Sequence, residues 1–163
     1  MTRKKVVDQP GGNILLDLFV VGQHLGGVLD AALLGTDVTP AQYAVYTQLS
    51  RNPQTPGQLC ATLGLRPATL SGYLRAMERR RDVTRTRAET DGRSYTIALT
   101  KSGRARVETC RPRFRRAVRL VEQYLSEGEG RLDTQQALVQ LDDALLAAAA
   151  RLSADHAPPP PTT

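Results

Sequence analysis

The sequence predicts a mainly α-helical fold that contains one small β-hairpin. Apolar residues recur at helical spacing through most of the chain. Two Thr-Pro-x-Gln segments, at 39–42 and 55–58, have the form of helix starts. An Asp-Gly pair at 91–92 lies between two short segments of alternating polarity, which is typical of a hairpin turn. The predicted order is therefore helices, then a hairpin, then helices.

The composition fits one compact domain, or a small domain whose outer helices bury their apolar faces against a partner. The chain has 163 residues, of which 40% are hydrophobic. Its two cysteines, Cys60 and Cys110, cannot make a disulfide framework and suit a reducing cytoplasm. Both occupy apolar positions of expected helices, so we interpret them as buried small hydrophobes and expect no redox or metal role.

The positive charge is concentrated in the middle of the chain. Residues 66–119 contain 16 Lys and Arg against five Asp and Glu, a formal charge of +11, so the rest of the chain carries −5. Arginines that merely decorated solvated helix faces would be balanced by nearby acidic residues. The net charge of +6 therefore favours an anionic partner for the central segment.

A helix is expected within residues 13–35, after an N-terminal tail at 1–12 that we expect to be disordered. Asn13 has the side chain of a helix cap, while Gly22, Gly26 and Gly27 weaken the helix in isolation. The helix must therefore be stabilised by packing, and dimerisation would supply it. No stretch approaches the roughly 20 uninterrupted apolar residues of a membrane span, so we expect no membrane partner. The apolar positions are Ile14, Leu15, Leu18, Val21, Leu25, Val28, Leu29 and Leu33.

Residues 36–100 contain the pattern helix, short helix, tight turn, helix. The first of these helices runs from Thr39 to about Arg51 and stops before Pro53. The short helix extends from Thr55 to Gly64, and Pro67 opens the next one. That third helix places Leu70, Tyr73, Leu74 and Met77 on one face. A short helix, a turn and a second helix form the pattern of a helix-turn-helix.

The hairpin follows this helix pair directly. Residues 82–87 and 94–100 alternate as strands, with Tyr95, Ile97 and Leu99 on one face. Beyond the hairpin, Thr100 is expected to cap a long helix that reaches about Ser126, kinked at a proline at 112. A third capping box is predicted at residues 133–136, at the start of a final helix. Residues 153–163 are expected to form a disordered tail.

The helix pair and hairpin together indicate DNA binding. The outward side of the second helix carries small side chains and one long guanidinium, Arg75, which is the best candidate for reading a base edge. The segment could also be an ordinary amphipathic pair in a helical core. The hairpin favours DNA binding, because a ribbon tipped by Arg87 and Arg93 makes a wing that reaches the minor groove. The outward residues are Ala68, Thr69, Ser71, Gly72 and Arg75.

The sequence resembles the MarR family of regulators. The resemblance rests on Leu-Gly-Leu-Arg-Pro-Ala-Thr-Leu-Ser at 63–71, Asp-Gly-Arg at 91–93 and Leu-Thr-Lys-Ser-Gly at 99–103, and it covers about residues 14–150. It implies a winged helix-turn-helix domain at 36–100 between dimerisation helices at 13–35 and 101–152. It also implies that Arg93 is the wing-tip residue and that Asp91 holds the wing arginine pair with Arg85 or Arg93.

One position departs from the family pattern. Many members have Ser or Thr as the cap of the recognition helix, where this chain has Arg66. The local cap is therefore weaker, and Arg66 is free for a phosphate contact. The complete set of expected DNA-facing residues is Thr55, Gln58, Arg66, Ala68, Thr69, Ser71, Gly72, Arg75, Arg85, Arg87, Asp91 and Arg93.

The resemblance further implies a small, often aromatic or phenolic, effector in a cleft beside the dimerisation helices. Candidate lining residues are Phe19, His24, Tyr43 and Tyr46, although aromatic residues at helical spacing are also typical of plain core. No cysteine occurs in 9–18, where the peroxide-sensing branch has one, so we do not expect that kind of sensing. No catalytic constellation or spaced metal-ligand set is evident, so neither an enzyme nor a cofactor is expected.

The sequence therefore predicts a cytoplasmic, nucleoid-associated homodimer that binds a pseudo-palindrome in double-stranded DNA and represses transcription. Two alternatives stay open. One is an architectural protein that binds duplex without sequence preference. The other is a helical module whose basic face contacts an acidic protein.

Overall fold

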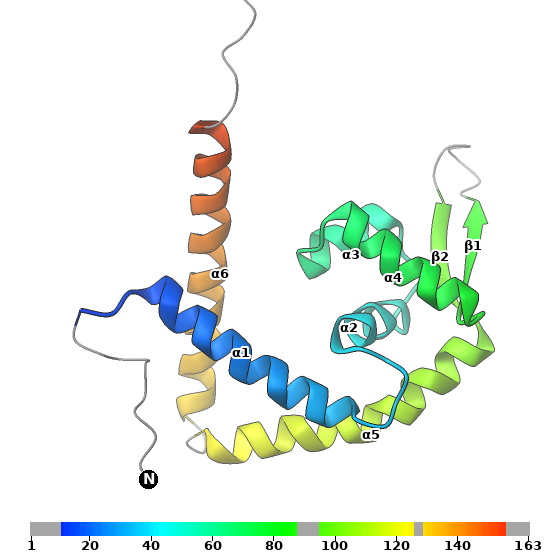
Figure 1. The fold of residues 1–163 in the computed structure, drawn as a ribbon, viewed down its shortest axis with the longest axis horizontal. Helices are drawn as coiled ribbons and strands as arrows, with labels where there is room; N and C mark the ends of the chain where they lie inside the picture. The colour runs from blue at the N-terminus through cyan, green and yellow to red at the C-terminus, as the bar shows by residue number, and fades with distance from the viewer. Residues whose placement is uncertain (1–10, 88–94, 126–128, 156–163) are drawn as a thin grey trace, which may run out of the picture. The chain divides into compact units, whose positions relative to one another are not determined.

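The computed structural model describes residues 11–87, 95–125 and 129–155, and these residues form six helices and two strands (Figure 1). The chain divides into two compact units, one ending at Ala117 and one beginning at Val118. The boundary between the units falls inside a helix. The elements are α1 (Ile14–Leu33), α2 (Pro40–Leu49), α3 (Pro56–Leu63), α4 (Pro67–Arg79), β1 (Val83–Arg87), β2 (Tyr95–Leu99), α5 (Lys101–Tyr124) and α6 (Glu129–Asp155).

The helix starts in the first unit follow from local capping chemistry. The hydroxyl oxygens of Thr39 and Thr55 each accept from the backbone N–H of the Gln three residues later, at 3.2 Å. The Gln side chains reach back to the Thr N–H groups, which completes both predicted capping boxes. Asn13 Oδ1 accepts from Leu16 N at 2.9 Å and begins α1. These predictions are confirmed.

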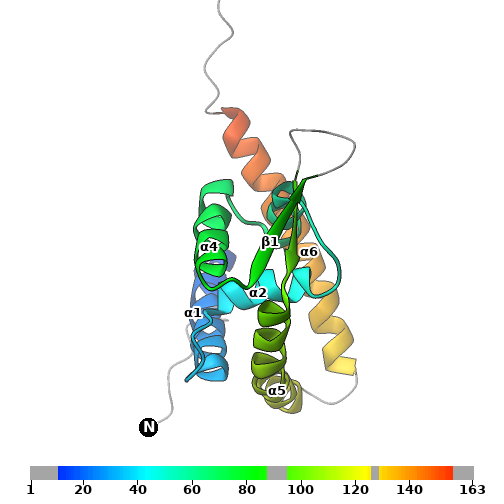
Figure 2. The same ribbon diagram turned by 90° about the vertical axis from the view of Figure 1, so that its right-hand side faces the viewer.

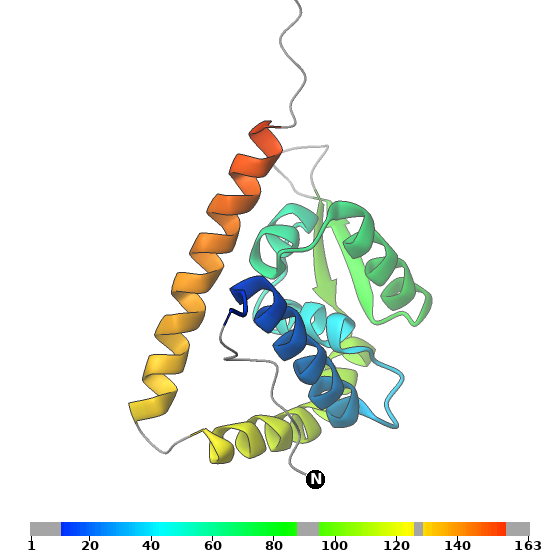
Figure 3. The same cartoon turned by 60° about the vertical axis from the view of Figure 1, so that its left-hand side comes forward.

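The turn between α3 and α4 depends on a glycine. Gly64 has φ +61° and ψ +26°, the left-handed conformation that ends helices at low steric cost. The N–H of Leu65 then donates to the carbonyl of Cys60 at 3.1 Å. Pro67 opens α4 two residues later. Figure 3 shows the two helices joined by this short turn, with α1 alongside α2.

The hairpin is antiparallel, with Val83 opposite Leu99 and Arg87 opposite Tyr95. Its inner face places Ile97 and Leu99 in the core, as the alternation predicted. Gln54, just before α3, pairs with Ile97 through two backbone hydrogen bonds of 3.1 and 2.8 Å. This bridge joins the hairpin to the start of α3. The wing tip, including Asp91 and Arg93, lies outside the described residues.

A single hydrophobic core fills the first unit. It draws on the end of α1, the α1–α2 loop, α2, α3, α4, both strands and the first half of α5. That half of α5 therefore belongs to the core of the first unit. Tyr43 packs against Phe114 with ring centroids 4.9 Å apart. The core residues are Leu33, Val38, Tyr43, Val45, Tyr46, Leu49, Leu59, Leu70, Leu74, Met77, Val83, Ile97, Leu99, Val107 and Cys110.

Two predictions about the C-terminal helices are wrong. Helix α6 begins at Glu129, so Asp133 lies inside it and does not cap it. The helix therefore includes Gly130, because one glycine in a helix costs only about 1 kcal/mol. The helix also continues to Asp155, so Ser153 is helical and not part of a tail. Pro112 lies inside α5, which continues past it to Tyr124, and the expected kink stays a prediction.

Several helices expose large apolar side chains. On α1 these include Phe19, Val21 and Leu25, and on α6 they include Leu138, Leu146 and Leu152. Helix α1 is also long and apolar enough, by length and composition alone, to cross a membrane, with a mean hydropathy of 1.4. The sequence-based expectation counted only uninterrupted apolar runs, whereas a mean hydropathy tolerates the two aspartates of this helix, Asp17 and Asp30. Exposed apolar faces of this kind are typical of surfaces that bind a protein or a membrane.

Candidate nucleic-acid interface

Helix α4 has one buried and one exposed face. Leu70, Leu74 and Met77 are at most 2% exposed and fix the helix on the core at a spacing of four and three residues. The five outward residues of the predicted interface are all exposed: Ala68, Thr69, Ser71, Gly72 and Arg75. A Cβ added at Gly72 would meet nothing within 4 Å, so the surface there is open. The structure therefore brings these five residues together on one accessible face.

This geometry makes a sharp prediction for Gly72→Ala. The substitution should stabilise the isolated protein by up to about 1 kcal/mol, because alanine favours a helix interior and the added methyl meets no neighbour. DNA affinity should nevertheless fall severalfold, because a Cβ at a close backbone approach keeps the duplex away. Thermal unfolding and fluorescence anisotropy measure the two effects. An unchanged affinity would place Gly72 away from DNA.

The strands lie beside α4, as Figure 2 shows. Arg85 of β1 forms an ion pair with Glu78 of α4, and its guanidinium carbon lies 4.8 Å from the centroid of the Tyr95 ring. The hydrogen bond to Glu78 raises the pKa of Arg85. The resemblance implied that Asp91 pairs with Arg85 or Arg93, but Asp91 and Arg93 lie outside the described residues. Among the described residues, Arg85 pairs with Glu78. Arg87 ends β1.

Three further residues of the predicted interface lie at the start of α3 and directly before α4. The hydroxyl oxygen of Thr55 and Oε1 of Gln58 are engaged in the capping box at the start of α3. Arg66 is exposed and precedes α4 without a side-chain capping bond, as the departure from the family pattern predicted. Arg66 therefore lies at the N-terminal end of α4, where phosphates are favoured.

A buried ionic cluster around Asp82 was missed by the sequence analysis. Asp82 is 0% exposed. Its Oδ2 accepts a 2.5 Å hydrogen bond from the Tyr46 hydroxyl and lies 2.7 Å from Nε of Arg106 and 3.3 Å from Nε of Arg80. Its Oδ1 accepts from Ser102 Oγ at 2.8 Å. Only the fold brings these residues together, because they are distant in the sequence.

The partners decide the charge state of this cluster. Burial alone raises the pKa of the Asp82 carboxyl, but the hydrogen bonds from Tyr46 and Ser102 and the charge of Arg106 outweigh burial and lower it. Burial and the bond to Asp82 raise the pKa of Tyr46, which keeps its hydroxyl a donor. The carboxylate therefore contributes stability above its unfolded pKa of about 3.9 and loses it as the pH falls through the lower folded value.

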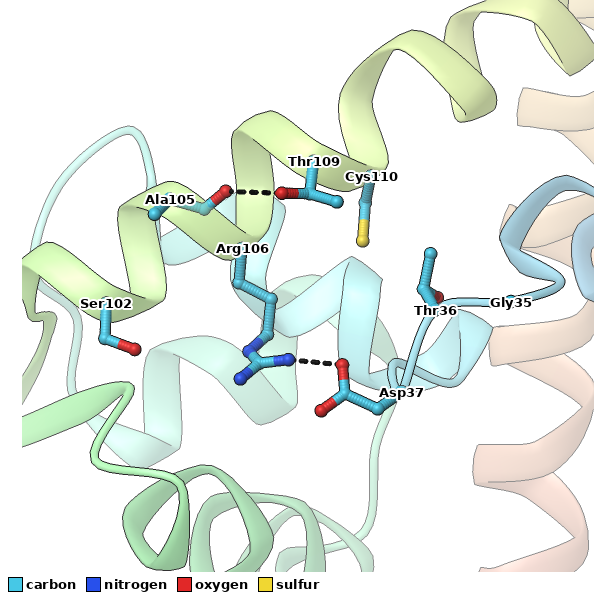
Figure 4. Close-up of a pocket in the computed structure, with 8 residues that line it drawn as sticks. All are labelled: Gly35, Thr36, Asp37, Ser102, Ala105, Arg106, Thr109 and Cys110. Carbon is cyan, nitrogen blue, oxygen red and sulfur yellow. Dashed lines mark hydrogen bonds and ion pairs between the residues drawn. The ribbon is translucent and has the colours of Figure 1, made fainter.

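A pocket of about 460 Å³ lies beside this cluster, between the α1–α2 loop and the start of α5 (Figure 4). Arg106 points across it to form an ion pair with Asp37, and the Cys110 thiol faces the same space. Burial raises the pKa of that thiol, which makes it unreactive. The lining residues are Gly35, Thr36, Asp37, Ser102, Ala105, Arg106, Thr109 and Cys110.

The four aromatic residues proposed for effector binding do not line this pocket. Tyr43 and Tyr46 are buried in the core, which is the alternative that the sequence left open. Phe19 and His24 are exposed on α1. Helical spacing could not distinguish these environments, because core and pocket aromatics share the same pattern. Among the described residues, no group of three His, Cys, Asp or Glu side chains is placed to hold a metal ion.

Comparison with known families agrees with this geometry. Residues 36–94 match the family model of the MarR family. These residues include α2, α3, α4 and β1, and therefore the whole exposed face of α4. No curated protein matches the chain.

Solved structures share the fold along most of the chain. A probable transcriptional regulator from Pseudomonas aeruginosa is 24% identical, with a TM-score of 0.73 over 84% of this chain and 99% of its own. The M. tuberculosis transcriptional regulator MosR, solved with DNA, is 23% identical, with a TM-score of 0.73 over 84% and 98%. S. aureus MepR in a DNA complex is 21% identical, with a TM-score of 0.74 over 84% and 99%.

Proposed function

We propose that this chain, whose residues 36–94 match the MarR family model, is a DNA-binding transcriptional regulator that acts as a homodimeric repressor. Its proposed site is a pseudo-palindromic operator, from which a small molecule releases it. The observation that carries the proposal is the exposed face of α4. The side chains around Gly72 are short, which lets the helix approach base edges closely. Arg75 adds one long guanidinium that can pair with a base.

Charge supports duplex DNA as the partner. The segment that holds α4, the strands and α5 carries the excess of arginine, whereas the rest of the chain is net acidic. Arg66 and Arg75 are exposed at the expected interface. Exposed guanidinium groups on one side attract phosphates and align the reading helix. Arg87 and Arg93 are proposed to extend this surface into the minor groove.

The uncovered apolar side chains support a dimer. Val21, Leu25 and Val28 follow one another on α1 at a spacing of four and three residues, and all three are exposed. A second copy would cover them by two-fold symmetry. Two reading helices related in this way favour half-sites centred about 10 base pairs apart. A cytoplasmic, nucleoid-associated location follows from binding chromosomal DNA.

Release by a small molecule is the most specific part of the proposal. The pocket beside Arg106, at about 460 Å³, has the size of small-molecule sites. Phe19 and His24 are proposed as further effector contacts at the surface of α1, where a second subunit would complete a cleft. A phenolic or aromatic effector fits such a cleft.

The deciding experiment is selection of bound duplexes from a random pool at about 150 mM salt, where nonspecific binding is already weak. Enrichment of a pseudo-palindrome supports the dimeric regulator and supplies a probe for effector screening. Binding without enrichment would favour the architectural alternative. No binding at all would favour a protein partner for the basic face.

Arg75→Ala tests the reading helix directly. The variant should lose about 1–3 kcal/mol of discrimination between the selected site and a mismatched one, because the guanidinium pairs with a base edge. Its affinity for unrelated duplex should change far less. Arg79→Ala on the same helix is the control, since Arg79 is exposed but lies in the last turn. Equal discrimination by both variants would remove Arg75 from base reading.

A further inference from the structure

The corner between α4 and β1 is a tightly held backbone turn. Asp82 donates its N–H to the carbonyl of Met77 at 2.9 Å, and its own carbonyl accepts from Thr100 N at 2.9 Å. The Thr100 hydroxyl also donates to the carbonyl of Arg81, which itself has φ +58°. A positive φ is uncommon outside glycine, so the surrounding contacts must impose it. The last turn of α4 is therefore joined to the first turn of α5.

The Asp82 side chain adds contacts to α2, to α5 and to the residue that follows α4. Its partners are Tyr46 on α2, Ser102 and Arg106 on α5, and Arg80 directly after α4. Arg80 also donates to the carbonyl of Asp37 at 3.0 Å and to Gln42 Oε1 at 3.1 Å. Arg106 in turn reaches Asp37 across the pocket of Figure 4. One carboxylate thus fixes the corner against both α2 and α5.

A buried ionic cluster is an expensive way to obtain stability. Desolvation of the charges offsets much of their attraction, and apolar residues of similar size often stabilise a core equally well. What the charges add is geometry, because each hydrogen bond fixes a direction that apolar packing does not. The two strands and α4 diverge from this corner, so a change of angle here displaces the whole reading surface.

We infer that Asp82 is a positioning residue, which holds the recognition helix α4 and the hairpin at one angle on α5 and thereby sets operator affinity without touching DNA. The inference rests on the proposed function. Asp82 is fully buried, so DNA cannot reach it. Two reading helices must enter successive major grooves together, which demands a fixed angle. The attraction of arginines to phosphates depends much less on a fixed angle between the helices.

The test compares Asp82→Asn with Val45→Ala, a buried cavity variant on α2 that leaves the cluster's side-chain partners in place. Each full-length variant is titrated with the selected operator and with a scrambled duplex at one salt concentration, well below its unfolding temperature. Asp82→Asn should lose about tenfold in operator affinity and at most about twofold on the scrambled duplex, because only the specific complex needs the fixed angle. Val45→Ala should keep its specificity ratio.

Amide hydrogen exchange measures the rigidity of the α4–β1 corner without DNA. Amides of residues 77–85 and 100–106 should exchange faster in Asp82→Asn, while those of α3 should not. If Asp82→Asn does not fold, Tyr46→Phe replaces it, since it removes only one hydroxyl from the cluster and should shift both readings in the same direction.

Two results would overturn the inference: an unchanged specificity ratio, or unchanged exchange at the corner. A wild-type protein that selects no operator would instead contradict the proposed function, while the exchange measurement would still test whether Asp82 fixes the corner.

Discussion

Replacing Gly103 by alanine is expected to destabilise the folded protein by about 3 kcal/mol, near the upper end for an added methyl group in a packed interior. A Cβ at this position would lie 2.1 Å from the carbonyl oxygen of Asp82, 3.0 Å from its carbonyl carbon and 3.1 Å from Leu99 Cδ2. Two of these atoms are backbone and cannot rotate away. The first turn of α5 must therefore move off the α4–β1 corner.

Urea unfolding measures this loss, and Gly57→Ala is the matched control. A Cβ at Gly57 would find its nearest neighbour, Thr55 Oγ1, at 3.9 Å, so that variant should change stability by no more than about 1 kcal/mol. A Gly103→Ala protein as stable as the wild type would mean that α5 does not approach Asp82 this closely. The contact also gives a physical reason for the glycine in the Leu-Thr-Lys-Ser-Gly motif.

Leu25→Asp is expected to separate the proposed dimer and to lower operator affinity by about a hundredfold. Burial of a leucine contributes about 1.5–3 kcal/mol, and two-fold symmetry applies the loss twice. A carboxylate at the interface adds a desolvation cost. Leu25 is 54% exposed within the subunit, so the fold of the subunit itself should survive. Sedimentation velocity and anisotropy measure the two effects.

Gln23→Asp is the control for this change. It adds the same charge to the same helix about half a turn away from the strip formed by Val21, Leu25 and Val28. It should leave the dimer and operator binding intact. Equal dissociation by both variants would assign the effect to net charge, and a Leu25→Asp protein that remains a dimer would move the interface to other residues. Detergent-dependent solubility of the wild type would instead point to a membrane for α1.

Much of the fold could be predicted because its signals are local. The capping residues Thr39 and Thr55 and the left-handed Gly64 act within four residues of their own position, and the sequence states them directly. The exposed face of α4 was equally predictable, since helical periodicity separates Leu70 and Leu74 from Arg75. The capping pattern at 133–136 was misleading, and the predicted start of α6 was wrong because the helix begins at Glu129.

Contacts between distant segments could not be predicted. Asp82 was predicted to be the first residue of a strand, and no sequence pattern around it identifies Tyr46 or Arg106 as its partners. Glu78 as the partner of Arg85 was missed because the two residues lie on different elements. Nor could helical spacing show that Tyr43 and Tyr46 are buried in the core and do not line the pocket beside Arg106. Periodicity identifies an inward face, but it does not show whether that face meets a cavity or other side chains.

The bridge between Gln54 and Ile97 limits how the domain can vary in length. Because Gln54 pairs with the middle of β2 and α3 starts two residues later, the segment from the end of α2 to the start of α3 has a set span. One inserted residue there would shift the side chains by one position and turn an inward residue outward. Related proteins should therefore tolerate insertions between β1 and β2 far more readily than between α2 and α3.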